Sequence, residues 1–287
     1  MQRFRGPIDL HAHSSVSDGT ETPADLVRSA AEAGLGTVAI TDHDATAGWE
    51  PASDEARRVG VTLIPGMELS TRLEYASVHM LAYLFDPADS ALLAETARIR
   101  AARLTRAEEI VRRISRDYDI TWDDVLAQTT PDSTVGRPHI ADALVARGHA
   151  PDRSDAFAGI LHWRRGYYQP HYAPDPLTGV RLIRAAGGVP VLAHPGTRGV
   201  ESVIPASRLE KLVDAGLFGL EIDHRENTPD AKVRLHDLAS RFGLVVTGSS
   251  DYHGDGKPNR LGENTTTPEA LERIIAEATG SEPVYGG

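Results

Sequence analysis

The chain has 287 residues, of which 40% are hydrophobic and 25% charged, a composition typical of soluble globular proteins that excludes a disordered or fibrous chain. Its formal net charge of −11 argues against tight binding to long duplex DNA, which normally needs a basic face. Because cysteine is absent, disulfides and thiolate ligands are excluded, and any metal site must use His, Asp and Glu.

Short apolar runs rich in Val, Ile and Leu recur along the chain, mostly with helical segments between them. This alternation is typical of repeated βα units. Near-continuous apolar strands favour a parallel sheet that is covered by helices. The runs therefore predict an α/β fold, a distorted (β/α)7 TIM-like barrel that is short of the usual eight strands. The predicted strands cover residues 7–12, 37–41, 61–65, 77–84, 189–193, 218–222 and 244–248.

Helix boundaries are marked by capping residues. Thr22-Pro23 supplies an N-cap and a first-turn proline, and Gly34 ends the helix that they start. Thr228-Pro229 and Thr267-Pro268 repeat this pattern, which predicts helices that begin at these points.

The βα pattern is interrupted between Phe85 and about Pro176. Three helices are predicted there, over residues 88–116, 121–127 and 138–147. We therefore expect a small helical insertion domain, residues 88–175, that contributes to the substrate site. The barrel would comprise residues 1–87 and 176–287.

The insertion is rich in arginine, but glutamates alternate with the arginines. Glu95, Glu108 and Glu109 favour a solvated, salt-bridged helix face over a nucleic-acid-binding patch. The arginines interpreted in this way are Arg98, Arg100, Arg103, Arg106, Arg112 and Arg113.

Residues of metal-ligand type follow the predicted strands, at the barrel end where the chemistry of such folds is found. His11 and His13 lie two apart on a strand, so both rings can point to one side, and Asp251 and His253 repeat this spacing. A lone histidine on an apolar strand is more often a hydrogen-bonded core residue, but so many together favour a metal site. Glu68, after the strand 61–65, is the best candidate for a bridging carboxylate.

Five separated motifs resemble, in order, those of the polymerase and histidinol phosphatase (PHP) family, over the barrel portions of the chain. Within that family the chain is similar to phosphoesterases that act on 3′,5′-bisphosphonucleotides and, in some members, on short RNA from the 5′ end. The segments Gly136–Ala141 and Ala185–Gly188 support this subgroup. The five motifs are Asp9–His13 followed by Ser15–Gly19, then Ile40–Asp44, Pro65–Glu68 and Ala193–Pro195.

The resemblance implies three divalent metal ions, with Mn expected most and Fe or Zn as alternatives. From the residues alone Asp18 is equally well explained as part of a turn, and the resemblance makes it a ligand. The implied ligands are His11, His13, Glu68 and Asp251 for the first ion, Glu68, His79 and His194 for the second, and Asp18, His43 and His253 for the third. Among these residues we expect Glu68, His194 and Asp251 to be catalytic.

Five further residues are predicted to contact substrate. The resemblance favours Arg137 and His139 as phosphate donors. Arg165 stands near the place where many relatives carry a Gly-Lys-Pro segment, and Arg198 lies in a loop after His194. His224, at the end of the sixth strand, would bind substrate or protonate the leaving oxygen as a catalytic residue.

The implied activity is that of a metal-dependent phosphoesterase. We expect a metal-bridging hydroxide to remove the 3′-phosphate of a 3′,5′-bisphosphonucleotide, with short single-stranded RNA as a longer substrate, because such a cationic site suits a phosphate ester. Alternatives are histidinol phosphate hydrolysis, hydrolysis of a C–N bond, and a non-catalytic PHP module, against which the complete ligand set argues. No apolar run could span a bilayer and no signal peptide is evident, so we expect a cytoplasmic protein without membrane or obligatory protein partners.

Overall fold

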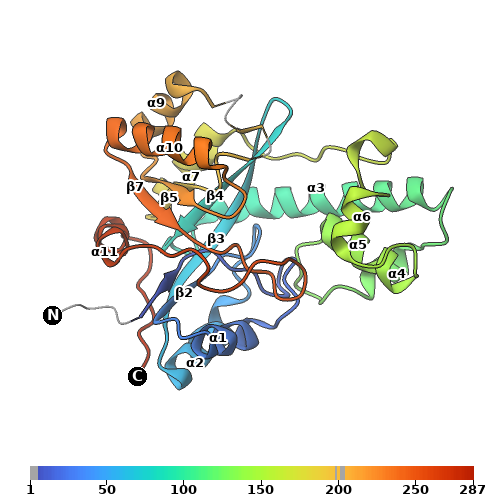
Figure 1. Ribbon diagram of the computed structural model, residues 1–287, viewed down its shortest axis with the longest axis horizontal. Helices are drawn as coiled ribbons and strands as arrows, with labels where there is room; N and C mark the ends of the chain where they lie inside the picture. Colours follow the sequence, from blue (N-terminus) through green and yellow to red (C-terminus); the bar gives the residue numbers. More distant parts are fainter. Residues whose placement is uncertain (1–5, 198, 201–203) are drawn as a thin grey trace.

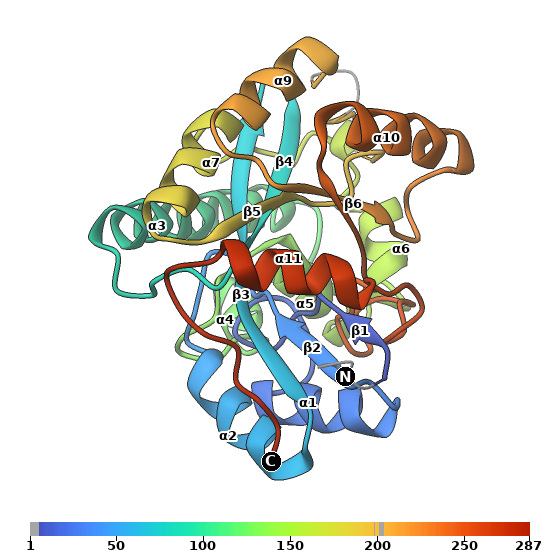
Figure 2. The same cartoon turned by 90° about the vertical axis from the view of Figure 1, so that its left-hand side faces the viewer.

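The computed structural model describes residues 6–197, 199–200 and 204–287. Its centre is a seven-stranded sheet in which the strands follow one another in chain order. The sheet curls around a common interior, with helices outside it (Figures 1 and 2). The strands are β1 (Ile8–Asp9), β2 (Thr37–Ile40), β3 (Thr62–Leu73), β4 (Ala76–Tyr83), β5 (Val189–Leu192), β6 (Gly219–Asp223) and β7 (Val245–Gly248). The predicted (β/α)7 barrel is confirmed.

One part of the sheet differs from the predicted βα pattern. β3 and β4 form an antiparallel hairpin, and β4 also pairs antiparallel with β5, whereas the remaining neighbours are parallel. Only Glu74 and Tyr75 separate the two strands, and Glu74 has a positive φ of 54° at the turn. Too few residues are available for a crossover helix, so the chain reverses at once.

The two ends of the sheet approach each other through the segments that follow β1 and β7. Ala12 forms a parallel bridge with Tyr252, and the His13 amide donates to the Tyr252 carbonyl at 2.8 Å. This contact nearly closes the barrel. It also places His11 and His13 beside Asp251 and His253, which are far away in the sequence.

Helices cover the outside of the barrel and one of its ends. The predicted N-caps are confirmed, since Thr22, Thr228 and Thr267 each accept a hydrogen bond from the amide three residues on. Leu271 and Ile274 pack against the apolar residues inside the barrel. The covering helices are α1 (Pro23–Glu32), α2 (Trp49–Val59), α7 (Pro176–Ala185), α9 (Ala206–Asp214), α10 (Pro229–Phe242) and α11 (Pro268–Glu277).

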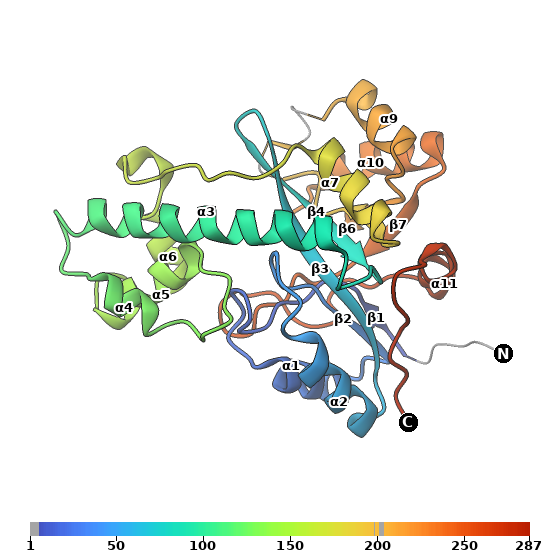
Figure 3. The same cartoon turned by 180° about the vertical axis from the view of Figure 1, so that it is seen from behind.

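Between β4 and α7 the chain leaves the barrel, and α3 extends far from it, as Figure 3 shows. Helices from this segment share a hydrophobic cluster that includes Ile110, Ile140 and Leu144. The elements are α3 (Ser90–Ile114), α4 (Trp122–Leu126), α5 (Arg137–Ala146), α6 (Arg153–Ala158) and a 3₁₀ turn, η1 (Trp163–Arg165). The domain boundaries at 88 and 175 stay a prediction. Within the described ranges, no helix has both the length and the apolar character that crossing a membrane requires.

Candidate metal centre and active-site pocket

The nine predicted ligands lie together at one end of the barrel, and none has more than 9% of its surface exposed. Most of them follow the C-terminal end of a parallel strand. His79 instead lies in the antiparallel strand β4, and Glu68 lies inside β3, not in a loop after it as the sequence suggested. The difference arises because β3 continues to Leu73 by pairing with β4, with Glu68 opposite Leu81.

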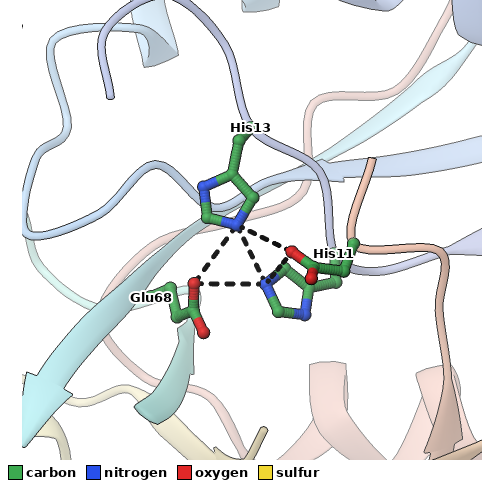
Figure 4. Close-up of side chains that lie close together, drawn as sticks. His11, His13 and Glu68 are labelled. Carbon is green, nitrogen blue, oxygen red and sulfur yellow. Dashed lines mark hydrogen bonds and ion pairs between the residues drawn. The ribbon is translucent and has the colours of Figure 1, made fainter. Parts of the chain in front are cut away.

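Two imidazoles and two carboxylates form the first group. The Nε2 atoms of His11 and His13 are 3.0 Å apart. His13 Nε2 lies 3.2 Å from Glu68 Oε2 and 3.4 Å from Asp251 Oδ1. Figure 4 shows the rings of His11 and His13 pointing toward the Glu68 carboxylate. The four residues could hold one metal ion.

The carboxylate of Glu68 also faces a second set of rings. Its Oε1 atom is 2.7 Å from His79 Nδ1 and 3.2 Å from His194 Nε2. Its Oε2 atom is 3.2 Å from His43 Nδ1. Glu68 therefore has the position of a ligand shared between ions, with different imidazoles at its two oxygens.

Asp18 is the centre of a third group. Its Oδ1 atom lies 3.3 Å from His253 Nε2 and 3.6 Å from His13 Nδ1, and its Oδ2 atom lies 3.8 Å from His43 Nε2. The His253 ring is oriented by its other nitrogen, because Nδ1 donates to the Asp251 carbonyl at 2.8 Å. Nε2 is thereby left as an acceptor that faces Asp18.

The donor atoms in this cluster fit divalent cations. Three buried atoms find no hydrogen-bond partner within the part of the chain that the structure describes, which is costly unless a ligand satisfies them: Asp18 Oδ1, His43 Nδ1 and His253 Nε2. Burial alone would raise the pKa of Glu68, but the charges of His79, His43 and His11 lower that pKa well below its usual value. An ionised carboxylate among converging imidazole nitrogens matches the ligands of Mn, Fe or Zn.

Sequence reasoning missed Glu221, which orients two of the histidines. Its side chain is fully buried, and its Oε1 atom accepts from His11 Nδ1 at 2.9 Å. Its Oε2 atom accepts the backbone N–H of His194 at 2.9 Å. With the proton on Nδ1, the lone pair of His11 Nε2 is available to a metal, an arrangement common in metal sites. A single glutamate within the apolar run 218–222 was the available signal.

Asp42 and Asp44, which flank His43, fix the backbone around the cluster. Asp42 accepts hydrogen bonds from Ser14 and from the Ser17 hydroxyl, at 2.6 Å for the latter, and so holds the loop that carries Asp18. Asp44, at a φ of 53°, accepts the Ser70 amide at 2.7 Å.

Two of the ligand-type residues occupy a backbone conformation that non-glycine residues rarely adopt. His194 has a φ of 28° and Asp251 a φ of 55°. Such positions cost free energy and concentrate at functional sites, where the surrounding structure holds them.

The cluster opens into a pocket of about 610 Å³ that lies between the barrel and the insertion. Arg137, one of the residues predicted to contact substrate, lines it, and its guanidinium lies 5.4 Å from the ring of Tyr168. The cationic residues of the lining are Arg72, Arg103, Arg106, Arg137, Arg153, Arg225 and Lys257. In a chain of net charge −11, this concentration of cations favours an anionic ligand.

The interpretation of Arg103 and Arg106 as solvated was wrong. Both are buried and line the pocket, because this part of α3 lies against the barrel, where Arg103 contacts Asp44 and Ser70. Arg103 forms a buried ion pair with Asp44, Nε to Oδ2 at 2.9 Å. Farther along the helix, Arg112 and Arg113 pair with Glu109 at the surface, as expected.

Three of the predicted substrate contacts do not line this pocket. His139 is buried, and its Nδ1 accepts the Gly136 amide at 3.1 Å, which caps α5. Arg165 is exposed and lines a separate depression together with Arg116. His224 is fully buried, with Nδ1 accepting the Glu226 amide at 3.1 Å. Burial lowers the pKa of His224, but Asp251 and Glu221 raise it, with a net increase.

Arg198, a further predicted contact, lies outside the described residues. Sequence reasoning also missed Lys257, whose Nζ lies 2.7 Å from Asp251 Oδ2 at the edge of the pocket. Its position six residues after a ligand-type aspartate gave no distinctive motif.

The chain is similar to known proteins over most of its length. The family model described as PHP domain matches residues 9–129. A 3′,5′-nucleoside bisphosphate phosphatase from Chromobacterium violaceum is 31% identical over 272 residues, covering 94% of this chain and 95% of that protein. The 5′-3′ exoribonuclease Rnm of Salmonella typhimurium is 31% identical over 270 residues, covering 93% and 92%. The solved structure of a candidate metal-dependent phosphoesterase from Bifidobacterium adolescentis has a TM-score of 0.93 and 44% identity, covering 96% of this chain and 97% of that one.

Proposed function

The chain belongs to the PHP family of metal-dependent phosphoesterases and is a hydrolase, and on that premise we propose that it removes the 3′-phosphate from a 3′,5′-bisphosphonucleotide. Short single-stranded RNA would be its longer substrate. One observation carries the proposal: a buried cluster of metal-ligand type faces a pocket whose far wall is cationic. The activities named for the two curated relatives support this substrate class.

The residues of the cluster would hold three divalent ions, with Mn as the expected metal. We assign His11, His13, Glu68 and Asp251 to the first ion, Glu68, His79 and His194 to the second, and Asp18, His43 and His253 to the third. When bound, such ions lower the pKa of a coordinated water and polarise the phosphoryl oxygens. Glu68, whose two oxygens face the first and second groups, would be a ligand common to both ions.

The wall of the pocket would bind the nucleotide. Arg137 donates to the Leu161 carbonyl at 2.7 Å, which fixes its guanidinium above Phe157. Phe157 and Tyr168 both line the pocket and offer faces for a base. His224 Nε2 lies 3.6 Å from Asp251 Oδ2 and does not line the pocket, so we propose that His224 positions Asp251.

A phosphate-release screen tests the proposal. We expect the Mn-loaded enzyme to hydrolyse adenosine 3′,5′-bisphosphate faster than adenosine 5′-monophosphate or histidinol phosphate, and to release nucleotides from 5′-phosphorylated RNA. His13→Ala and Asp251→Ala should remain folded but lose metal, as measured by elemental analysis. Preferred turnover of histidinol phosphate would reject the substrate class, and unchanged metal content in both variants would reject the ligand assignment.

A further inference from the structure

Arg106 is a buried cation that lies on α3 and faces no carboxylate of the described residues. Its side chain is 9% exposed, and the described part of the chain offers it no salt bridge. Its Nη1 donates to His171 Nδ1 at 3.0 Å, and its Nε has no hydrogen-bond partner among the described residues. Burying a charge without a counter-charge costs free energy. A ligand that supplies an anion to Arg106 would offset this cost and explain why the guanidinium is buried.

The surroundings of Arg106 make that cost larger. Burial and the positive charges of Arg103, Arg137 and Arg72 lower the pKa of Arg106 to about 9. Arg103 is neutralised by Asp44 and donates to the Ser70 hydroxyl. Arg72 and Arg106 also line the pocket, but neither forms an ion pair with any of the described residues.

His171 supplies a neutral donor at the same place. Its Nδ1 accepts from Arg106, so its proton resides on Nε2, which is buried and to which no described residue offers an acceptor. Burial, followed by the charges of Arg106, Arg103 and Arg72, lowers the pKa of His171 to about 2. The ring therefore stays neutral and keeps one N–H that is free to donate.

We propose that Arg106, Arg72 and His171 form a second anion subsite, which binds a phosphate group of the substrate other than the one that is hydrolysed. All three residues line the pocket that contains Glu68, His79 and His194. The assignment rests on the proposed function for its orientation: the phosphate at the metal cluster is cleaved, and the phosphate at this subsite is retained.

The spacing of the two sites follows from β3. Arg72 lies four residues after Glu68 on this strand, so their side chains leave the same face, with Cα atoms about 13 Å apart. Arg106 is on α3, and His171 is on the segment that returns beside α3 toward the barrel (Figure 3). The subsite thus selects a small molecule with two phosphate monoesters held a fixed distance apart.

Binding of adenosine 5′-monophosphate to the full-length, Mn-loaded protein tests the subsite without turnover. We expect Arg106→Gln to weaken the Kd, measured by calorimetry, by about ten- to a hundredfold, the usual loss for a charged hydrogen bond. Arg100→Gln is the matched control, because Arg100 is exposed on the same helix and does not line this pocket. Equal Kd values for the two variants would overturn the subsite.

A kinetic comparison separates the subsite from the proposed function. Arg106→Gln should lower kcat/KM for adenosine 3′,5′-bisphosphate at least tenfold more than it lowers kcat/KM for p-nitrophenyl phosphate, which has one phosphate. An equal loss on both substrates would refute the subsite. Absence of hydrolysis by the wild type would instead refute the proposed function, while the binding measurement would still decide the subsite.

Thermal unfolding separates a binding role of Arg106 from a structural role, because the two roles predict opposite changes in the Tm of the ligand-free variant. Without phosphate, Arg106→Gln should have a higher Tm than the wild type, because the variant removes an uncompensated buried charge. Added adenosine 5′-monophosphate should raise the Tm of the wild type more than that of the variant. A lower Tm of the ligand-free variant would make Arg106 a structural residue and overturn the proposal.

Discussion

Replacing Glu221 by glutamine tests whether this buried carboxylate controls the first metal group. The carboxylate accepts two hydrogen bonds, from His11 Nδ1 at Oε1 and from the His194 amide at Oε2. A glutamine has one acceptor oxygen and one NH2 group, so it cannot satisfy both donors. If the oxygen accepts from His194, the NH2 group faces His11 and forces the proton onto Nε2, which then cannot bind metal.

The expected loss can be worked from this contact. Removing a hydrogen-bond partner of a metal-ligating histidine typically lowers metal affinity by 10–100-fold, or about 1.4–2.8 kcal/mol. We expect a loss in this range for Glu221→Gln at the ion held by His11, and a smaller loss at the ion held by His194, whose amide donates to the same carboxylate. Titration of the metal-free protein with Mn against a competing chelator measures it, and elemental analysis counts the ions retained.

Asp223→Asn is the matched control, because it makes the same chemical change two residues along β6, where the side chain is half-buried and faces Lys232 at 3.5 Å. The control should bind all ions with wild-type affinity. Equal affinities for Glu221→Gln and the wild type would show that the carboxylate does not set the state of His11, and would refute the reasoning.

Three further predictions concern stability and metal content. Tyr83→Phe removes the buried hydrogen bond to the Leu10 carbonyl, 2.9 Å long, and should lower the free energy of unfolding by about 1 kcal/mol in urea titrations; no change would mean that the bond is not formed in solution. Gly19→Ala would place a Cβ 2.1 Å from the His13 carbonyl oxygen, so it should displace Asp18 and reduce bound metal in elemental analysis, and full metal content would contradict this. Mn at a hundredfold excess over its Kd should stabilise the metal-free protein by about 3 kcal/mol in denaturant titrations, and no shift would contradict binding to the folded state.

The sequence predicted those features that depend on local pattern. Apolar runs located the strands, and the His11-Ala12-His13 spacing put both rings on one side, as the structure has them. Features that depend on distant segments were missed. The hairpin of β3 and β4 places Glu68 inside a strand, which the run 61–65 could not reveal because Pro65 and Gly66 are residues that normally interrupt a strand.

The arginines of α3 show the same limit. Arg103 and Arg112 have similar neighbours in the sequence. Arg103 lies where α3 contacts the barrel and is buried, whereas Arg112 lies farther along the helix at the surface. Only the path of the helix distinguishes them. Glu221 was missed because a carboxylate within an apolar strand has no assignable role until its partners, His11 and His194, are brought to it.

The ion pair between Arg103 and Asp44 limits which segments from relatives can replace residues 88–175 in this protein. A chimera that receives residues 88–175 from a relative with different substrates must supply a cation where Arg103 now stands. Without one, Asp44 would be a buried, unpaired charge, a defect that costs about 3–5 kcal/mol. The defect would lie next to His43, so an exchange meant to alter substrate preference would also impair the metal cluster. Successful exchanges should therefore keep this arginine while the rest of the segment varies.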